Sequence, residues 1–442
     1  MIRKNNGPSL AMFLMGLFSQ TQIHFIGFLD ISEAFSYVAG PILFAMDWPK
    51  LKKHGFGPFL GVWFLCIIGA WISSLCNDTP TQSMLRGLAS PFSVFCIACV
   101  FHHILSQDLK SFRWFFLGAA ISGVISIFAF QRGTGIAKYG EVLTGEEAVE
   151  SITNYSLFWL VQIGTWLVLP LQSWYLKTPK WYCIAFGLWF MLYGLFSAGS
   201  RSGLLVSALF LFLICVAGKT RQSMMFMKRH FTAFIVVFFA VGPLVATFYK
   251  YAATQGYMGE GAHEKYLKQT GGKSGLLNLL KGGRGEFFVG LAACAEKPII
   301  GYRPWAKDKD GFLYRYIQEN GSDESLEDYN RALKYGRTPG LPSHSYVITF
   351  WLWFGILGLI CMLYTGWLYF TTLKNRMHIV PELYGYFAFM LPSVAWAWFF
   401  SPFGTRTAST LLMVLCLFTR AIEKGQFAFV SDADMPYRRI GR

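Results

Sequence analysis

The sequence predicts an all-α, polytopic integral membrane protein with about twelve transmembrane helices and one large exterior loop. Only 14% of its 442 residues are charged and 54% are apolar, whereas a soluble domain carries about 25% charged residues. Apolar runs of about 20 residues, the length that a helix needs to cross a bilayer, recur along the chain. Helices are the expected element because every backbone polar group must be bonded inside hydrocarbon.

The expected spans follow from the positions of the apolar runs. They cover residues 8–28, 31–47, 56–76, 83–105, 112–130, 155–176, 181–197, 202–218, 230–249, 344–372, 382–400 and 406–422. The organisation that we expect is a first membrane segment, a long polar insert containing short helices, a second membrane segment and a tail. In residue numbers these are 1–249 with helices 1–9, 250–343, 344–422 with helices 10–12, and 423–442.

The distribution of charge predicts the orientation of the chain. The net charge of +15 could indicate a nucleic-acid partner. However, most cations lie in short loops between alternate spans, as in multi-pass membrane proteins. The excess of Lys and Arg on one side predicts that both termini and the 423–442 tail are cytoplasmic, and that the 131–154 loop and the 250–343 insert lie outside. The four glutamates of the 131–154 loop suggest either a lid or simply a solvated loop.

The cysteines do not indicate a disulfide framework or a metal site. Most of the nine lie inside apolar runs, without metal-ligand spacing. Cys96 and Cys99 form a CxxC pair inside PFSVFCIACVF, where one face of a structural helix is a better interpretation than a redox pair.

Two classes of function remain, a transporter and a membrane enzyme. None of the 24 acidic residues falls in the middle of an expected span, although buried carboxylates mark ion-coupled transport. The enzyme class is favoured by lone arginines without nearby acids at the expected exterior face, because such cations suit a ligand with several negative charges. These arginines are Arg86, Arg201, Arg284, Arg303 and Arg406.

Three segments stand out among these positions. LFSAGSRSGLLV holds Arg201 among small residues, which allow either a ligand or a neighbouring helix to approach. GGRGEFFVGLAACAEK holds Arg284 after two glycines, and we expect a short helix that ends before Pro298. A glycine-rich start of a helix attracts phosphate, but a flexible turn with a solvated arginine is equally compatible with this pattern.

The third segment, LPSHSYVITFWLWFG, places His344 at the outer mouth of the tenth span. Histidine titrates near neutral pH and can act as a general base, although a histidine at an interface is often structural. The DxD motif of Asp308 and Asp310 could hold a metal ion, but a three-residue match in a polar loop is weak support for one.

Taken together, these residues resemble the O-antigen ligase and O-antigen polymerase superfamily of bacterial membranes. The segments that carry the resemblance are SAGSRSG, GGRGEFFVGLAACAEKPIIGYRP and HSYVITFWLWFGILG, in this order and with a large periplasmic loop before the third-last span. The chain departs from the family at Ser345, where Asn is frequent, and in TFWLWFGILG, where a polar or acidic residue often precedes the glycine.

The resemblance implies an inverting, metal-independent glycosyltransferase of the bacterial inner membrane without a cofactor. Arg201 and Arg284 would bind the diphosphate of an undecaprenyl-diphosphate-linked glycan, and His344 would deprotonate the acceptor hydroxyl. Arg86 and Arg303 are further candidates for phosphate or sugar contacts. The expected acceptor is a lipid A-core sugar, as in a ligase. The alternatives are a polymerase that uses a second lipid-linked repeat unit and, in another class, a transporter of the lipid-linked glycan.

Overall fold

The computed structural model describes five helices and a hairpin near the N-terminus, three helices in the insert and one long helix after it. The described residues are 6–19, 22–24, 28–53, 56–130, 276–320, 323–335, 338–342 and 345–376, with short stretches or single positions in 229–267 and 394–415. The helices are α1 (Gly7–Leu17), α2 (Ile31–Lys53), α3 (Gly57–Cys76), α4 (Thr81–Gln107), α5 (Phe112–Phe130), α14 (Leu276–Glu296), α15 (Phe312–Asn320), α16 (Asp323–Lys334) and α17 (Tyr346–Arg376).

Three of the described helices are long and apolar enough to cross a membrane. They are Gly57–Cys76, Thr81–Gln107 and the Tyr346–Thr372 part of α17. The mostly helical, membrane-type fold is therefore confirmed for the described residues. The predicted spans between residues 155 and 228 lie outside the described residues, so the count of about twelve spans stays a prediction.

The predicted first span, 8–28, is wrong in its extent. Helix α1 ends at Leu17, where the Ser19 hydroxyl donates to the carbonyl of Gly16 at 2.7 Å. A two-stranded antiparallel hairpin follows, with β1 at Gln22–His24 and β2 at Phe28–Asp30. The polar sequence SQTQ after the helix explains the early end, because these side chains favour turns over an apolar helix. Eleven residues span only about 17 Å, which is too short for a bilayer.

Two pairs of helices pack closely against each other. Helix α1 packs along α5 through Gly16 and Gly118, whose missing side chains leave room for the backbone of the partner helix. Helix α2 packs along α4, since the Tyr37 hydroxyl lies 2.6 Å from that of Ser93. Further along both helices, a Cβ at Gly40 would lie 2.7 Å from that of Cys96. Helices α2 and α4, which are separated by the single helix α3, are thus parallel, as alternate crossing of a membrane requires.

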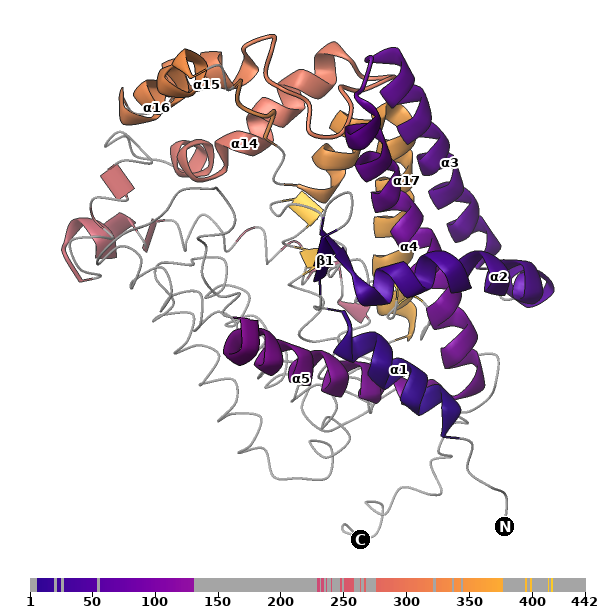
Figure 1. The fold of residues 1–442 in the computed structure, drawn as a ribbon. Helices are drawn as coiled ribbons and strands as arrows, with labels where there is room; N and C mark the ends of the chain where they lie inside the picture. The colour runs from indigo at the N-terminus through magenta and orange to yellow at the C-terminus, as the bar shows by residue number, and fades with distance from the viewer. Residues whose placement is uncertain are drawn as a thin grey trace, which may run out of the picture.

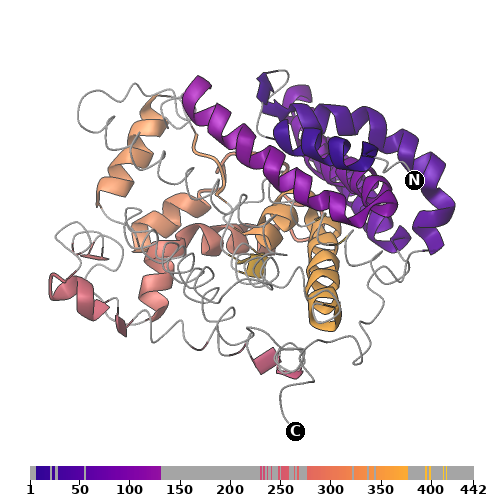
Figure 2. The same ribbon diagram turned by 90° about the horizontal axis from the view of Figure 1, so that it is seen from below.

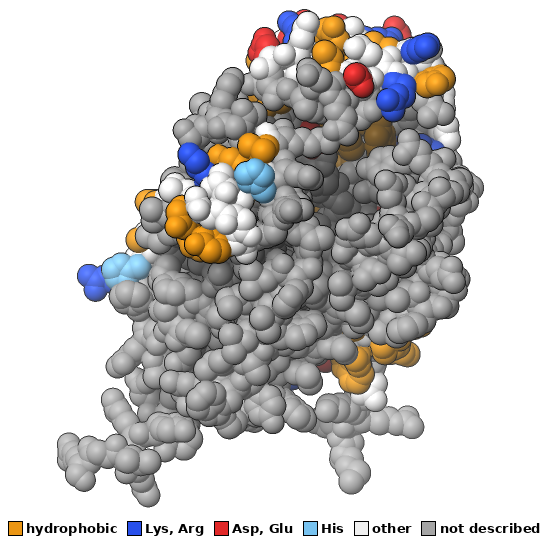
Figure 3. Space-filling model, turned by 90° about the vertical axis from the view of Figure 1, so that its left-hand side faces the viewer, with side chains coloured by type: hydrophobic (Ala, Val, Ile, Leu, Met, Phe, Trp, Pro, Cys, Tyr) orange, Lys and Arg blue, Asp and Glu red, His pale blue; other side chains and the backbone are white. Residues whose placement is uncertain are grey.

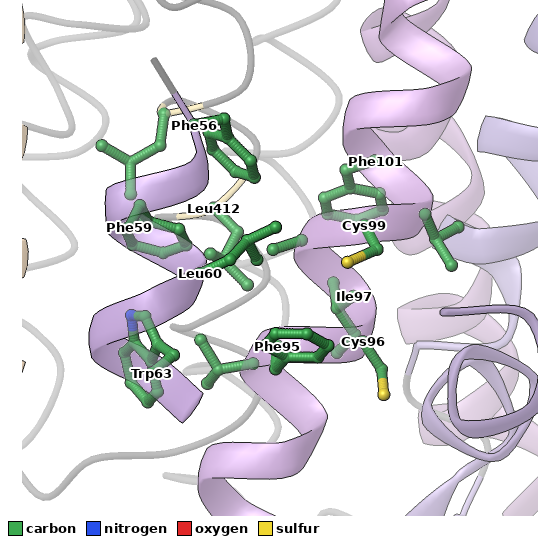
Figure 4. Packing of buried hydrophobic residues seen from close by; sticks show 14 of the residues in the cluster. Phe56, Phe59, Leu60, Trp63, Phe95, Cys96, Ile97, Cys99, Phe101 and Leu412 are labelled. Carbon is green, nitrogen blue, oxygen red and sulfur yellow. The ribbon is translucent and has the colours of Figure 1, made fainter. Parts of the chain in front are cut away.

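The main apolar core lies where α3 faces α4 and α17. Figure 4 shows Phe59, Leu60 and Trp63 on α3 beside Phe95 and Ile97 on α4, all of which belong to one cluster of buried apolar side chains. The indole of Trp63 also meets the ring of Phe350 edge-on, with 5.6 Å between the centroids. Aromatic rings dominate this core, and edge-to-face pairs of this kind add about 0.5–1.5 kcal/mol each to the free energy of apolar burial.

Helix α17 is interrupted at Gly355 and folds back on itself. Gly355 has φ 64° and ψ −150°, which is not a helical conformation. A Cβ at Gly358 would overlap the carbonyl oxygen of Phe350, two turns earlier in the sequence. The rings of Tyr346 and Trp398 meet edge to face with 5.6 Å between their centroids, and a Cβ at Gly366 would lie 2.8 Å from the same indole. A straight helix would separate residues 346 and 366 by about 30 Å.

The predicted tenth span, 344–372, is therefore two arms rather than one straight helix. The first arm comprises residues 346–354 and the second arm residues 356–376. The cause is local, because a positive φ combined with a ψ near −150° is a conformation open essentially only to glycine. A Cβ at Gly355 would also overlap the carbonyl oxygen of Ile299.

Residues 298–303, PIIGYR, form a strap that occupies this break. In an uninterrupted helix the amide of Ile356 would donate to the carbonyl of Leu352. Instead, the Ile356 amide donates to the carbonyl of Ile299 at 3.0 Å, and the Leu352 carbonyl accepts from the amide of Tyr302 at 2.6 Å. The strap thus satisfies both backbone groups that the break would leave without a partner, as an apolar environment demands.

The three helices of the insert lie apart from α1 to α4. Figures 1 and 2 show α14, α15 and α16 on one side of the molecule, α1 to α4 on the other, and α17 between them. Figure 3 shows charged side chains of both signs at its upper end, where Figure 1 places α15 and α16. The end formed by α15 and α16 is therefore polar, in contrast to the apolar helices α3, α4 and α17.

We predict that Gly355→Ala lowers the midpoint of thermal unfolding, Tm, by about 5 °C or more, because it adds the cost of a positive φ to a clash with the strap. Gly61→Ala on α3 is the matched control, since a Cβ there meets nothing within 4 Å. Tryptophan fluorescence of the purified variants in detergent measures both midpoints. An unchanged midpoint for Gly355→Ala would contradict the described break.

Candidate functional site

The structure describes some of the predicted site residues and not others. Arg201 and His344 lie outside the described residues, and so does the 131–154 loop. Arg284 lies in α14, but only its backbone is described. Arg86 is exposed in the second turn of α4, and Arg303 is half-buried at the end of the strap.

The expectation of a glycine-rich helix start at Arg284 is wrong. Helix α14 begins at Leu276, so Gly282, Gly283 and Arg284 lie in its interior. Backbone N–H groups in the interior of a helix are bonded to carbonyls four residues earlier and are not available to a phosphate. The prediction that this helix ends before Pro298 is confirmed, because α14 ends at Glu296.

A different role for the glycines of this helix follows from its packing. A Cβ at Gly285 would lie 2.5 Å from the ring of Tyr316 on α15. A Cβ at Gly290 would lie 2.6 Å from the side chain of Ile348 and 3.3 Å from the carbonyl oxygen of Pro342. The missing side chains therefore allow α14 to approach α15 on one side and the start of α17 on the other.

This packing brings the helix that bears Arg284 against the residues that flank His344. Pro342 and Ile348 stand on either side of the histidine in the sequence, and both contact Gly290. Arg284 precedes Gly290 by six residues, which is about 9 Å along the helix axis. Helix α14, which bears Arg284, and the segment from Pro342 to Ile348, which contains His344, are thus neighbours.

Ser345 fixes the start of the first arm. Its hydroxyl donates to the carbonyl of Trp398 at 2.9 Å, and its oxygen accepts from the amide of Ile348 at 3.3 Å. The side chain is fully buried. Ser345 therefore caps the first arm and ties it to a later helix, so the departure from the family pattern at this position has a structural function. Sequence reasoning missed this role, although serine before a helical run is a recognised capping signal.

Arg86 and Arg303 are carried by segments that contact each other. A Cβ at Gly87 would collide with the ring of Pro304, so the N-terminal part of α4 lies against the residue that follows the strap. The Arg303 guanidinium donates to the carbonyl of Asp78 at 3.4 Å. Arg303 itself has φ 79°, a left-handed conformation that is costly for a residue with a side chain. Such strain persists only where surrounding contacts hold it, and it is concentrated at functional sites.

The first aspartate of the DxD motif caps a helix. The carboxylate of Asp308 accepts from the amides of the first turn of α15, with 2.8 Å to Phe312 and 2.9 Å to Leu313. It also accepts from the hydroxyl of Tyr329 on α16 at 3.1 Å. Burial and the Asp308 charge raise the pKa of Tyr329 to about 12, so the phenol remains a neutral donor. Asp310 is exposed.

Cys294 and the nearby tyrosine of the strap, Tyr302, are poor nucleophiles. Cys96 and Cys99 are unlinked and buried in α4, in agreement with a structural helix face. Burial raises the pKa of the Cys294 thiol to about 12, which keeps it protonated at neutral pH. Burial and the charge of Asp310 also raise the pKa of Tyr302. Nucleophilic catalysis by a side chain is therefore not supported by this part of the site.

Asp308→Ala is expected to lower Tm and to expose the insert to proteolysis, because losing a helix cap costs about 1–2 kcal/mol. Asp310→Ala is the control for charge in the same loop and should leave both properties unchanged. Differential scanning fluorimetry and limited trypsin digestion measure the two effects. Equal loss of activity in both variants together with sensitivity to chelators would instead indicate a metal site.

Comparison with known families supports the resemblance seen in the sequence. Residues 186–363 match the family model described as O-antigen ligase. The matched segment includes Arg201, Arg284, Arg303 and His344, whereas Arg86 lies outside it. No curated protein and no solved structure matches the chain significantly. The predicted resemblance to the O-antigen ligase and polymerase superfamily is thus confirmed for residues 186–363, which match the O-antigen ligase domain.

Proposed function

We propose that this membrane protein transfers a glycan from an undecaprenyl-diphosphate-linked donor to an acceptor hydroxyl at the periplasmic face of the bacterial inner membrane. The proposed acceptor is a sugar of the lipid A-core. The match to the O-antigen ligase family supports this class of reaction. The single observation that carries the proposal is the contact of α14, which bears Arg284, with the residues on both sides of His344.

The proposed reaction is a single displacement. His344 accepts the proton of the acceptor hydroxyl as the oxygen attacks the anomeric carbon of the donor. The bond from that carbon to the phosphate oxygen breaks, and undecaprenyl diphosphate leaves with the bonding electrons. One displacement at the anomeric carbon inverts its configuration. The donor already carries the energy of the glycosyl–diphosphate bond, so no further co-substrate is needed.

Arg201 and Arg284 are proposed to bind the diphosphate. A planar guanidinium can donate two parallel hydrogen bonds to a phosphate, and it stabilises the charge that develops on the leaving group. Two arginines would supply the positive charge that a metal ion provides in other transferases, which is why we propose metal-independent transfer. Arg86 and Arg303 lie on segments in mutual contact and are proposed as further contacts to phosphate or sugar.

The proposed orientation places both termini in the cytoplasm and the 250–343 insert in the periplasm. The distribution of Lys and Arg supports it. The parallel packing of α2 with α4 is consistent with it, because alternate crossing gives these two helices the same direction. The glycan donor is presented on the outer leaflet in this arrangement, next to the polar insert.

The deciding experiment incubates the purified protein with an undecaprenyl-diphosphate-linked glycan, with and without lipid A-core, and resolves the products by mass. His344→Ala is measured in parallel, and it should reduce kcat by at least about a hundredfold if the histidine is the general base. Glycosylated lipid A-core from the native protein alone would establish a ligase. A lengthened lipid-linked glycan without acceptor would establish a polymerase. The absence of any covalent product would support a transporter.

Arg284→Ala is expected to raise the KM for the donor and lower kcat, whereas Arg284→Lys should retain part of the activity because the charge remains without the planar fork. Arg315→Ala is the matched control, since Arg315 lies on α15 and donates to the carbonyls of its own loop. Steady-state kinetics at varied donor concentration give both constants. Native constants for Arg284→Ala would remove this arginine from the proposed diphosphate site.

A further inference from the structure

Asn77, at the end of α3, is connected to the strap by its side chain. Its amide nitrogen donates to the carbonyl of Gly301 at 3.1 Å and to the carbonyl of Ser73, in the last turn of α3, at 2.8 Å. Gly301 lies 224 positions after Asn77 in the sequence. One half-buried amide thus joins the outer end of a membrane helix to the strap.

Gly301 lies in the break of α17, directly against Gly355. It has φ 75°, and a Cβ there would lie 2.7 Å from the Gly355 nitrogen and 2.7 Å from the Leu352 carbonyl oxygen. Next to it, the Tyr302 amide donates to that Leu352 oxygen. The position of the Gly301 carbonyl therefore determines whether the strap can complete the two backbone hydrogen bonds at the break.

Two further hydrogen bonds hold the two ends of the strap, at Arg303 and at Pro298. The Arg303 guanidinium donates to Asp78, the residue that follows Asn77. On the other side, the indole of Trp351 in the first arm donates to the carbonyl of Pro298 at 2.9 Å. The strap is thus attached to the α3–α4 turn and to the first arm of α17. It also follows α14 directly in the chain, so it connects three parts of the candidate site.

The direction of the first arm depends on this attachment. The arm leaves the break at Gly355 and leads back to Ser345, next to His344. Without the strap, Leu352 and Ile356 can bond to each other, and the arm can relax toward a continuous helix. A small change in direction at the break becomes a displacement of an ångström or more at the far end of the arm, which is enough to impair proton transfer.

We propose that Asn77 is a positioning residue for the proposed transfer reaction. Its amide holds Gly301, the strap holds the break in α17, and the break sets the direction of the arm at whose start His344 stands. Asn77 acts through the strap and does not touch the substrate. The inference rests on the proposed function, because it assigns His344 the role of the base.

Asn77→Ala tests the proposal by kinetics and by hydrogen exchange. We expect kcat to fall about tenfold while the KM for the donor stays within about threefold, because the base moves and the diphosphate site remains. Exchange of the Tyr302 and Ile356 amides, followed by mass spectrometry, should become about fivefold faster as their hydrogen bonds open more often. If Asn77 had a purely structural role, Asn77→Ala would lower Tm but would not lower kcat selectively while the KM for the donor stayed constant.

Asn6→Ala is the matched control, since Asn6 also stands at a helix end but is exposed and makes no side-chain capping bond. It should leave kcat and both amides unchanged. Native kcat in Asn77→Ala, with or without faster exchange, would overturn the inference, as would equal changes in kcat and KM. If His344→Ala is inactive in the same assay, either of these results for Asn77→Ala rejects only the role of Asn77. An active His344→Ala would reject the proposed base itself.

Discussion

The structure depends on the replacement of one helical hydrogen bond near Gly355 by two backbone hydrogen bonds to the strap. A continuous α17 would pair the amide of Ile356 with the carbonyl of Leu352. The strap separates these groups and bonds to each of them, through Ile299 and Tyr302. An apolar environment makes this exchange obligatory, because each unpaired backbone group there costs several kcal/mol. The break and the strap are therefore stable only together.

The arrangement of the candidate site follows from this exchange. The first arm of α17 turns back toward Trp398, and its capped start at Ser345 lies against α14. The same strap contacts the α3–α4 turn, so the segment that carries Arg86 is drawn to the segment that carries Arg303. Elements from three distant parts of the sequence are thus held in one place by main-chain bonds at the break and by side-chain bonds from Asn77, Arg303 and Ser345.

The sequence predicts α3, α4 and α5 well, but it misplaces the ends of α1 and α2 and misses the interruption of α17. The expected spans 56–76, 83–105 and 112–130 agree with α3, α4 and α5 to within two residues, because uniform apolar runs leave the backbone no alternative to a helix. The break in α17 could not be predicted, since Gly355 is one glycine in an apolar run and its conformation requires the strap as a partner. The same holds for Arg284, where two glycines suggested a helix start but packing against α15 and α17 favours a continuous helix.

The most direct test of the account is the distance between two spin labels on α17, one at position 347 in the first arm and one at position 367 in the second arm. Trp367 is exposed, so a label there does not disturb the core. The account predicts a single distance clearly shorter than the about 30 Å that a continuous helix would give. A distance near 30 Å would show an uninterrupted helix and would contradict the strap, the folded-back arm and the positions that depend on them.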